Sequence, residues 1–274
     1  MIIIPRKIFD KIKPINLIES NSSEFQNNIN VIDKLKTFNI DELNNWLKRN
    51  ALYVGQGSSR TSYLLADMTC LKIAHNKRGI DQNRIEYLNT TNANNSGIYK
   101  CFTEIYEADM KDFKFLRVEA ATVSKPSDFP KYLKGINHVI EASIIPIAMY
   151  IFNGNFNNIT QEKLDVLKDN TMYNDFSDAG NGVTSYSDDE VRNFLVSEPF
   201  ARITYHISRK RYENPSEEVL GSIYEFYKNN GLDSLSGVEL GTCDNWGVVW
   251  RNKRQQLIVI DAGYSKDMFY KIYS

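Results

Sequence analysis

Apolar residues recur at helical spacing in the first fifty positions of the chain. They lie three or four residues apart within 32–35 and again within 41–47. Residues with this spacing share one face of an α-helix. We therefore expect residues 1–50 to form a polar, helical N-terminal extension, with Asn39 or Asp41 capping its second helix.

From residue 51 onwards, short apolar runs separated by turn residues replace the helical pattern. Such runs are typical of β-strands, and the glycine-bearing stretch between the first two is typical of a turn. The pattern predicts strands at 51–54, 62–66 and 70–74, a helix at 80–89, and strands at 98–107 and 113–118. The expected order is three strands, a helix and two further strands.

Helical periodicity returns in the second half of the chain. Part of 131–150 is expected to be helical, as are 188–208 and 217–230. A stretch rich in Asn, Gly, Asp and Ser, residues 169–188, is typical of a long loop. The end of the chain is predicted to be β again, with strands at 247–250 and 257–260 forming a hairpin and Asp261 at its exit.

The composition narrows the classes of protein. The chain has 274 residues, 42% hydrophobic, with a formal net charge of -1. This length suits one large domain or two small ones, and the balanced charge gives no general attraction to nucleic acid. The basic stretch 209–211 is expected to be a solvated helix end. No apolar run reaches the roughly 18 residues of a membrane span. Three widely spaced cysteines argue against disulfides or a cysteine zinc site, so a cytoplasmic setting is expected.

A possible phosphate site lies between the first and third strands. Gly55 and Gly57 would let backbone N–H groups approach phosphate oxygens, as a Cβ would not. Lys72, within the third strand, would supply a cation, and Glu86 on the following helix would pair with it. Taken singly, each feature also fits an ordinary structure: a glycine-rich hairpin, a solvent-facing lysine, and a solvated helix carboxylate.

A possible metal site lies at the C-terminal hairpin. Asn245 precedes its first strand, and Asp261 follows its second strand. A tight hairpin brings these two ends together, and amide and carboxylate oxygens suit Mg²⁺. A turn asparagine and a strand-end aspartate with no metal role would give the same pattern.

Taken together and in order, these segments resemble the protein-kinase-like superfamily, most closely small kinase-like proteins of bacteriophages. The resemblance covers about 50–123 and 236–265, and rests on Gly55-Gln56-Gly57-Ser58-Ser59-Arg60, Cys70-Leu71-Lys72-Ile73-Ala74, Gln82-Asn83-x-x-Glu86, Asp244-Asn245-Trp246-Gly247 and Ile258-Val259-Ile260-Asp261-Ala262-Gly263. It implies an α+β, two-lobed fold: an N-terminal lobe of antiparallel sheet (51–123) and a mostly helical, truncated C-terminal lobe (124–274).

The resemblance also implies roles for individual residues, with ATP and Mg²⁺ as cofactors. Lys72 would bind the α- and β-phosphates and pair with Glu86. Adenine would meet a hinge at residues 119–121, and Mg²⁺ would be held by Asn245 and Asp261. The nucleotide-binding set is Gly55, Gly57, Ser58, Arg60, Lys72, Glu86, Glu119 and Ala121, and the catalytic set is Lys72, Glu239 and Asp261.

Four departures from the family pattern affect this interpretation. Arg60 replaces the third glycine of the loop. Leu240 stands where the family has the aspartate that acts as general base, and a one-residue bulge would be needed to bring Glu239 there. Ala262 replaces a phenylalanine after the metal-binding aspartate. Only 11 residues follow Gly263, too few for a long activation segment.

Three functions remain open from the sequence. The first is an ATP- and Mg²⁺-dependent transfer of the γ-phosphoryl group to a hydroxyl of a protein or a small molecule. The second is a catalytically inactive pseudokinase acting as an interaction or virion-associated module. The third is an unrelated α+β protein. We expect a nucleotide and an acceptor as partners, no membrane and no nucleic acid, in the host cytoplasm or the virion if a phage encodes the chain.

Overall fold

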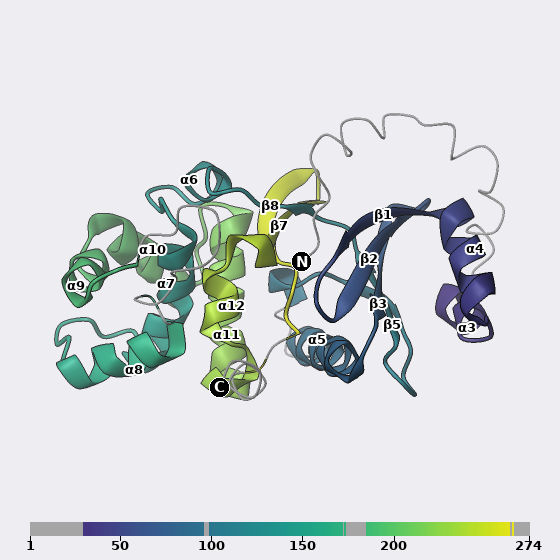
Figure 1. Ribbon diagram of the computed structural model, residues 1–274. Helices are drawn as coiled ribbons and strands as arrows, with labels where there is room; N and C mark the ends of the chain where they lie inside the picture. Colours follow the sequence, from purple (N-terminus) through teal and green to yellow (C-terminus); the bar gives the residue numbers. More distant parts are fainter. Residues whose placement is uncertain (1–29, 96–98, 172, 174–184, 264, 266–274) are drawn as a thin grey trace.

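The computed structural model describes residues 30–95, 99–171, 173, 185–263 and 265. Two parts of different make-up lie side by side (Figure 1). Residues 31–119 form an antiparallel sheet with helices around it, and residues 128–241 form a set of helices, with short strands from 122–123 and 246–259 between the two. None of the helices in the described ranges is both long and apolar enough to cross a bilayer.

The larger sheet has five strands, and every neighbouring pair is antiparallel. Its order is β1-β2-β3-β5-β4, formed by Ala51–Gln56, Arg60–Leu65, Thr69–Ala74, Phe115–Glu119 and Ile105–Ala108. The turn between β2 and β3 is fixed by Met68, which has a positive φ of 63°, and by Asp67, whose side chain accepts the Thr69 N–H. This register places Lys72 opposite Ser62 and Leu116 in the middle of the sheet.

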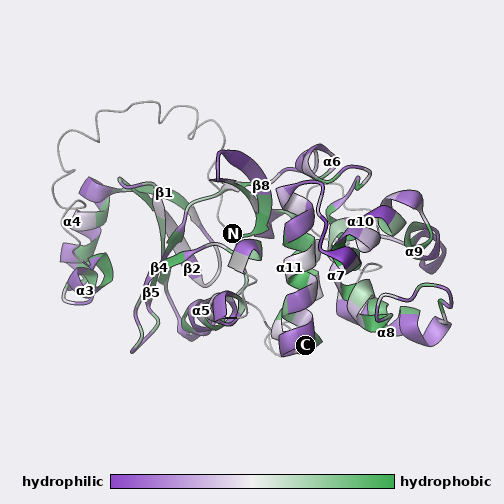
Figure 2. Cartoon of the chain, turned by 180° about the vertical axis from the view of Figure 1, so that it is seen from behind, coloured by the Kyte–Doolittle hydropathy of each residue, from purple (hydrophilic) through white to green (hydrophobic). Residues whose placement is uncertain are grey.

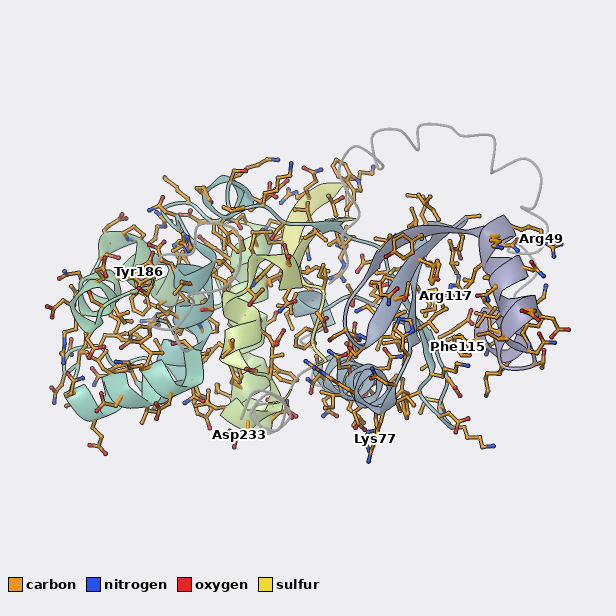
Figure 3. All side chains as sticks on the ribbon, in the orientation of Figure 1. Arg49, Lys77, Phe115, Arg117, Tyr186 and Asp233 are labelled. Carbon is orange, nitrogen blue, oxygen red and sulfur yellow. The ribbon has the colours of Figure 1, made fainter. Side chains whose placement is uncertain are left out.

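Helices cover both faces of this sheet. On one face lie α3 (Val31–Leu35) and α4 (Ile40–Asn50), which pack apolar side chains against Leu71, Ile73 and Phe115 (Figure 3). Asn39 caps α4 in a capping box with Glu42, so the first of the two expected caps is correct. Helix α5 (Lys77–Asn95) contacts β3 and β5. Alternation along β3 therefore turns Leu71 and Ile73 away from Lys72.

The second part is built around α7 (Val139–Ile151), of whose 13 residues ten are buried. Helices α11 (Pro215–Asn230) and α12 (Gly237–Gly241) pack against it, and α11 carries alternating hydrophobic and hydrophilic residues (Figure 2). The other helices of this part are α6 (Asp128–Tyr132), α8 (Gln161–Thr171), α9 (Asp188–Leu195) and α10 (Glu198–Arg209), and 3₁₀ turns lie at Tyr99–Cys101, Leu232–Ser234 and Cys243–Asn245.

A second, three-stranded sheet connects the two parts. It consists of β6 (Thr122–Val123), β7 (Trp246–Arg251) and β8 (Arg254–Val259), in that order and antiparallel. The β7–β8 turn is tight, with positive φ at Asn252 and Lys253. Trp246 is fully buried and packs edge-on against Phe129 of α6. The hairpin predicted from the sequence is therefore present, and its end is anchored in the core.

The α+β prediction, with an antiparallel sheet first and helices after it, is confirmed. Some of the element bounds were wrong. The strand expected at 98–107 is only β4, preceded by a 3₁₀ turn, and the helix expected at 188–208 is two helices. That break follows from Ser197, whose side chain caps α10 at the Phe200 N–H, with Pro199 in the first turn.

The remaining predictions on organisation have mixed outcomes. The loop expected at 169–188 begins too early, because α8 continues to Thr171; residues 172 and 174–184 of it, like residues 1–29 of the N-terminal extension, lie outside the described residues. The division into 1–50, 51–123 and 124–274 stays a prediction. Along the chain, α4 runs directly into β1, and β6 ends at Val123.

Candidate functional site

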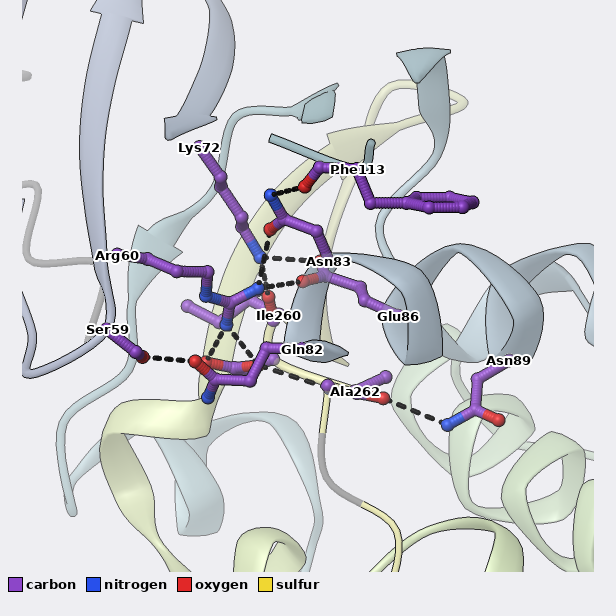
Figure 4. Close-up of polar contacts among 12 residues, drawn as sticks. Ser59, Arg60, Lys72, Gln82, Asn83, Glu86, Asn89, Phe113, Ile260 and Ala262 are labelled. Carbon is purple, nitrogen blue, oxygen red and sulfur yellow. Dashed lines mark hydrogen bonds and ion pairs between the residues drawn. The ribbon is translucent and has the colours of Figure 1, made fainter. Parts of the chain in front are cut away.

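Four charged side chains from four separate segments meet where the larger sheet faces the C-terminal hairpin (Figure 4). They are Arg60, Lys72, Glu86 and Asp261, referred to below as the ion cluster. All four are buried, with exposures of 7%, 0%, 1% and 5%. Arg60 and Lys72 come from β2 and β3, Glu86 from α5, and Asp261 from the residues that follow β8. Two positive and two negative charges thus share one buried volume.

Lys72 connects the sheet to the hairpin. Its Nζ lies 2.5 Å from Glu86 Oε1 and donates to the backbone oxygen of Ile260 at 3.0 Å. Ile260 directly precedes Asp261, so the ammonium group is fixed next to the candidate metal ligand. The expected pairing of Lys72 with Glu86 is present in the structure.

Glu86 is shared between the two cations. Its second oxygen, Oε2, accepts from the Arg60 guanidinium at 2.8 Å. One turn earlier on α5, Asn83 accepts from the same guanidinium at 3.2 Å and donates to the Phe113 oxygen at 2.9 Å. Residues three apart on a helix share a face, so α5 presents Asn83 and Glu86 together to Arg60.

Arg60 also binds the carboxylate of Asp261. One guanidinium nitrogen lies 2.7 Å from Oδ1 and 2.7 Å from Oδ2. Burial would lower the pKa of Arg60, but the charges of Asp261 and Glu86 outweigh it and hold the pKa above its ordinary value. Burial would likewise raise the pKa of Asp261, and the charges of Arg60 and Lys72 instead hold it well below its ordinary value. Both groups are therefore charged at neutral pH.

The glycine-bearing loop leads directly into this cluster. Gly55 lies in β1 opposite Ser62, and the Gly57 N–H donates to the Arg60 oxygen at 2.9 Å, which closes a tight turn. Ser58, at the tip, is exposed, and its backbone oxygen accepts from the Asn76 side chain at 3.2 Å. Of the loop residues predicted from the sequence, Gly55 is aligned through Ser62 with Lys72, and Arg60 is itself a member of the ion cluster.

The next residue of the loop, Ser59, is docked on α5. Its backbone oxygen accepts from the His75 N–H at 2.9 Å, and its hydroxyl donates to Gln82. A Cβ on Gly79 would lie only 2.2 Å from that same Ser59 oxygen. Glycine at position 79 is what allows the loop to approach the helix so closely.

Asn245 and Glu239 belong to the part of the site next to Ile260 and Asp261. The backbone oxygen of Asn245 accepts from the Ile260 N–H at 2.8 Å, and its side-chain amide donates to the Glu239 carboxylate and to the Glu239 backbone oxygen. Burial, with a contribution from the charge of Asp261, raises the pKa of Glu239 from 4.5 to about 8. Glu239 therefore carries a proton at neutral pH.

Asn245 and Asp261 suit a divalent metal by donor type. Both are buried oxygen donors in adjacent parts of the hairpin, and Mg²⁺ prefers such ligands. Among the described residues, none donates a hydrogen bond to Asn245 Oδ1. The Asp261 oxygens, however, both accept from Arg60. These residues fit Mg²⁺ once the guanidinium has moved away.

The predicted hinge residues lie further from the ion cluster. The Glu119 carboxylate binds the Arg251 guanidinium, with Nε at 3.0 Å, and it lines a cavity of about 500 Å³ together with Tyr106 and Trp250. Ala121 is buried beside β7. The two lie so close that a Cβ added to Gly247 would be 2.9 Å from the Cβ of Ala121. The Glu119 side chain is therefore bound by Arg251, and the Glu119 N–H donates to the Glu104 oxygen at 2.8 Å.

Several polar contributors to the site had no role predicted from the sequence, although Gln82 and Asn83 belong to the motif Gln82-Asn83-x-x-Glu86. Apart from Glu86, the buried face of α5 consists largely of uncharged polar or small residues: Gly79, Gln82, Asn83, Asn89, Thr90 and Ala93. Asn89 holds the loop after β8 by donating to the Ala262 oxygen at 2.9 Å. Polar residues at helical spacing on a helix otherwise poor in apolar residues were the signal that this face meets a polar site.

Comparison with models of known families gives no match, and comparison with characterised proteins gives none either. Among solved structures, one match is a ternary complex of streptomycin, ATP and APH(2'')-IIa, with 13% sequence identity over 83% of this chain and 71% of that chain, and a TM-score of 0.33. A likeness this weak carries no inference about fold or activity.

Proposed function

We propose that this protein binds ATP together with Mg²⁺ beside the ion cluster and transfers the γ-phosphoryl group to a hydroxyl of a protein or small molecule. Lys72 would contact the α- and β-phosphates, held in place by Glu86. Residues 55–60 would cover the phosphates with backbone N–H groups other than that of Gly57, which donates to the Arg60 oxygen. The hinge at Glu119 and Ala121 would receive adenine. Asn245 and Asp261 would hold Mg²⁺, which neutralises phosphate charge when bound.

The observation that carries this proposal is the position of Lys72. Its ammonium is fully buried, paired with Glu86, and bonded to the residue before Asp261. Burying several charges in one site contributes little to stability, because desolvation offsets most of the attraction. Apolar residues would fill the same space at lower cost. A buried arrangement of opposite charges beside a glycine-bearing loop is better explained by a ligand that uses it.

Catalysis in such a site would come mainly from positioning and charge neutralisation. Glu239 is the candidate general base, since its carboxylate accepts a hydrogen bond from the Asn245 side chain. With a pKa of about 8, it holds a proton at pH 7 and can accept another group's proton only after losing its own. We therefore expect the transfer rate to rise with pH as Glu239 loses its proton, and this rise to be absent in Glu239→Gln.

The pseudokinase alternative has one specific observation in its favour. Leu240, at the position where the resemblance places the general base, is fully buried, and the neighbouring Glu239 carboxylate is bonded to Asn245. If Glu239 stays protonated and fixed in the liganded protein, nucleotide would bind without phosphoryl transfer. Nucleotide binding with no ATP turnover at any pH would favour this alternative.

Thermal unfolding with and without ATP and Mg²⁺ tests the proposal. A ligand that binds only the folded state raises the melting temperature, and we expect a rise of several degrees at millimolar ATP that requires Mg²⁺. Asp261→Ala should abolish the effect of Mg²⁺, whereas Asp112→Ala, which changes an exposed turn aspartate, should retain it. No rise in the folded wild type would contradict the proposal.

A further inference from the structure

Arg60 occupies the groups that a metal and a nucleotide would need. Its guanidinium donates to both oxygens of Asp261 at 2.7 Å and to Glu86 at 2.8 Å. Charge-assisted contacts of this kind are among the strongest hydrogen bonds in proteins. With Arg60 and Asp261 both buried, solvent screens this pair little.

A divalent cation and this guanidinium compete for the same carboxylate. Asp261 has two oxygens, and both already accept from Arg60. A metal at those oxygens would also lie within a few ångströms of the guanidinium, and two positive charges at such a distance repel each other strongly in a buried site. Metal binding therefore requires Arg60 to leave Asp261.

The loop that carries Arg60 is fastened to α5 independently of Asp261. Ser59 is held through His75 and Gln82, and the Gly57 N–H closes the turn on Arg60. The backbone of Arg60 is thus fixed, while its long side chain has several rotatable bonds. A change of side-chain rotamer would move the guanidinium from Asp261 toward the backbone of residues 55–60. Phosphate groups bound under that loop would accept hydrogen bonds from it.

We propose that Arg60 is an internal counter-ion that holds the site closed: in the resting protein it occupies Asp261, and a divalent metal with nucleotide binds only by displacing it. This inference rests on the proposed function and adds a means of regulation to it. Any factor that draws the guanidinium away, phosphate groups included, would open the metal site.

The size of the effect follows from competition. If the open form makes up about 1–10% of the resting protein, the apparent dissociation constant for the metal is raised about 10- to 100-fold. A variant without the guanidinium would not show this rise in the dissociation constant. We expect Arg60→Gln to bind the metal at least about tenfold more tightly than the wild type.

The experiment measures binding of Mn²⁺, as a paramagnetic substitute for Mg²⁺, by electron paramagnetic resonance in the presence of a non-hydrolysable ATP analogue. The variants are Arg60→Gln and Arg60→Lys. Lysine keeps one positive charge but cannot hold both Asp261 oxygens and Glu86 with one planar group. The affinity of Arg60→Lys for Mn²⁺ should therefore lie between those of the wild type and Arg60→Gln. Arg84→Gln is the matched control, because Arg84 lies on the exposed face of α5 and pairs with Asp81. Circular dichroism confirms that each variant is folded.

Tighter Mn²⁺ binding in Arg60→Gln, intermediate binding in Arg60→Lys and wild-type binding in Arg84→Gln support the counter-ion role. Equal or weaker binding in both Arg60 variants, with metal bound by the wild type, overturns this inference and leaves the proposed function in place. Absence of metal binding in every folded variant overturns both. If Arg60→Gln does not fold, Arg60→Lys decides the question by the same criteria.

Discussion

Lys72 and Glu86 show how the charges of this site depend on one another. Lys72 neutralises one oxygen of Glu86, and Arg60 contacts the other. Because the groups are buried, removal of one leaves its partners without compensation in a region that water does not reach. The stability of the protein and the chemistry of the site are therefore linked at these residues.

Lys72→Met should lower the free energy of unfolding by roughly 3–5 kcal/mol, the usual cost of breaking a buried ion pair. Urea denaturation measures this change. Lys114→Met, which alters an exposed lysine near the same sheet, should change stability by less than about 0.5 kcal/mol. Because Lys72→Met with Glu86→Gln removes both charges, the double variant should lose less than the sum of the single losses.

Glu239 should make stability depend on pH within a defined window. Its pKa is raised on folding from 4.5 to about 8, so its contribution to stability is fully present below pH 4.5 and is lost as the pH rises through about 8. Relative to Glu239→Gln, the wild type should lose up to about 5 kcal/mol between these limits. Urea denaturation at pH 5 and pH 8.5 measures the difference. Asp261 does not interfere, because its lowered pKa acts only in acid. An identical pH dependence in the two proteins would contradict the raised pKa.

Single residues of the site were predictable to different degrees. Lys72, Glu86 and Asp261 could be named from the sequence because strand alternation and position relative to the loop and the hairpin locate them. The bond from Arg60 to Asp261 could not be predicted, since it joins residues 201 positions apart. The direction of the long, flexible arginine side chain does not follow from the sequence pattern.

At the scale of elements, the loop and α5 form one unit. Ser59 docks on the start of α5, and Gly79 supplies the space for it. The element order β-β-β-α-β-β was predictable from turn residues and apolar runs. The close approach of loop and helix was not predictable, because it depends on the missing Cβ of Gly79, which lies just outside the helix predicted at 80–89.

Gly79→Ala should destabilise the protein by about 1–3 kcal/mol, as is typical of overpacking. The sign is informative, since alanine within a helix would otherwise stabilise by about 0.5–1 kcal/mol relative to glycine. Thermal or urea unfolding gives the value. Asn94→Ala, at an exposed position of the same helix, serves as the control and should be neutral or slightly stabilising. An increase in stability on Gly79→Ala would contradict the close contact between the Ser59 oxygen and position 79.

At the scale of the whole molecule, the ion cluster joins parts that are distant in sequence. The sheet supplies Arg60 and Lys72, α5 supplies Glu86, and the hairpin supplies Asp261 on the side of the helical part. The α+β architecture was predictable from the change of periodicity along the chain. The break between α9 and α10 and the position of α12 were not predictable. A capping residue and a short buried helix change the hydrophobic periodicity of the sequence too little to be recognised.

The central claim is that Lys72 and Asp261 form an ATP and Mg²⁺ site, and isothermal titration with ATP tests it most directly. The titration compares wild type, Lys72→Met and the matched control Lys114→Met, each with and without Mg²⁺. The account predicts Mg²⁺-dependent binding in the wild type, retained by Lys114→Met and weakened at least about tenfold by Lys72→Met. Absence of binding to folded wild type at millimolar ATP, or equal binding by Lys72→Met, would contradict it.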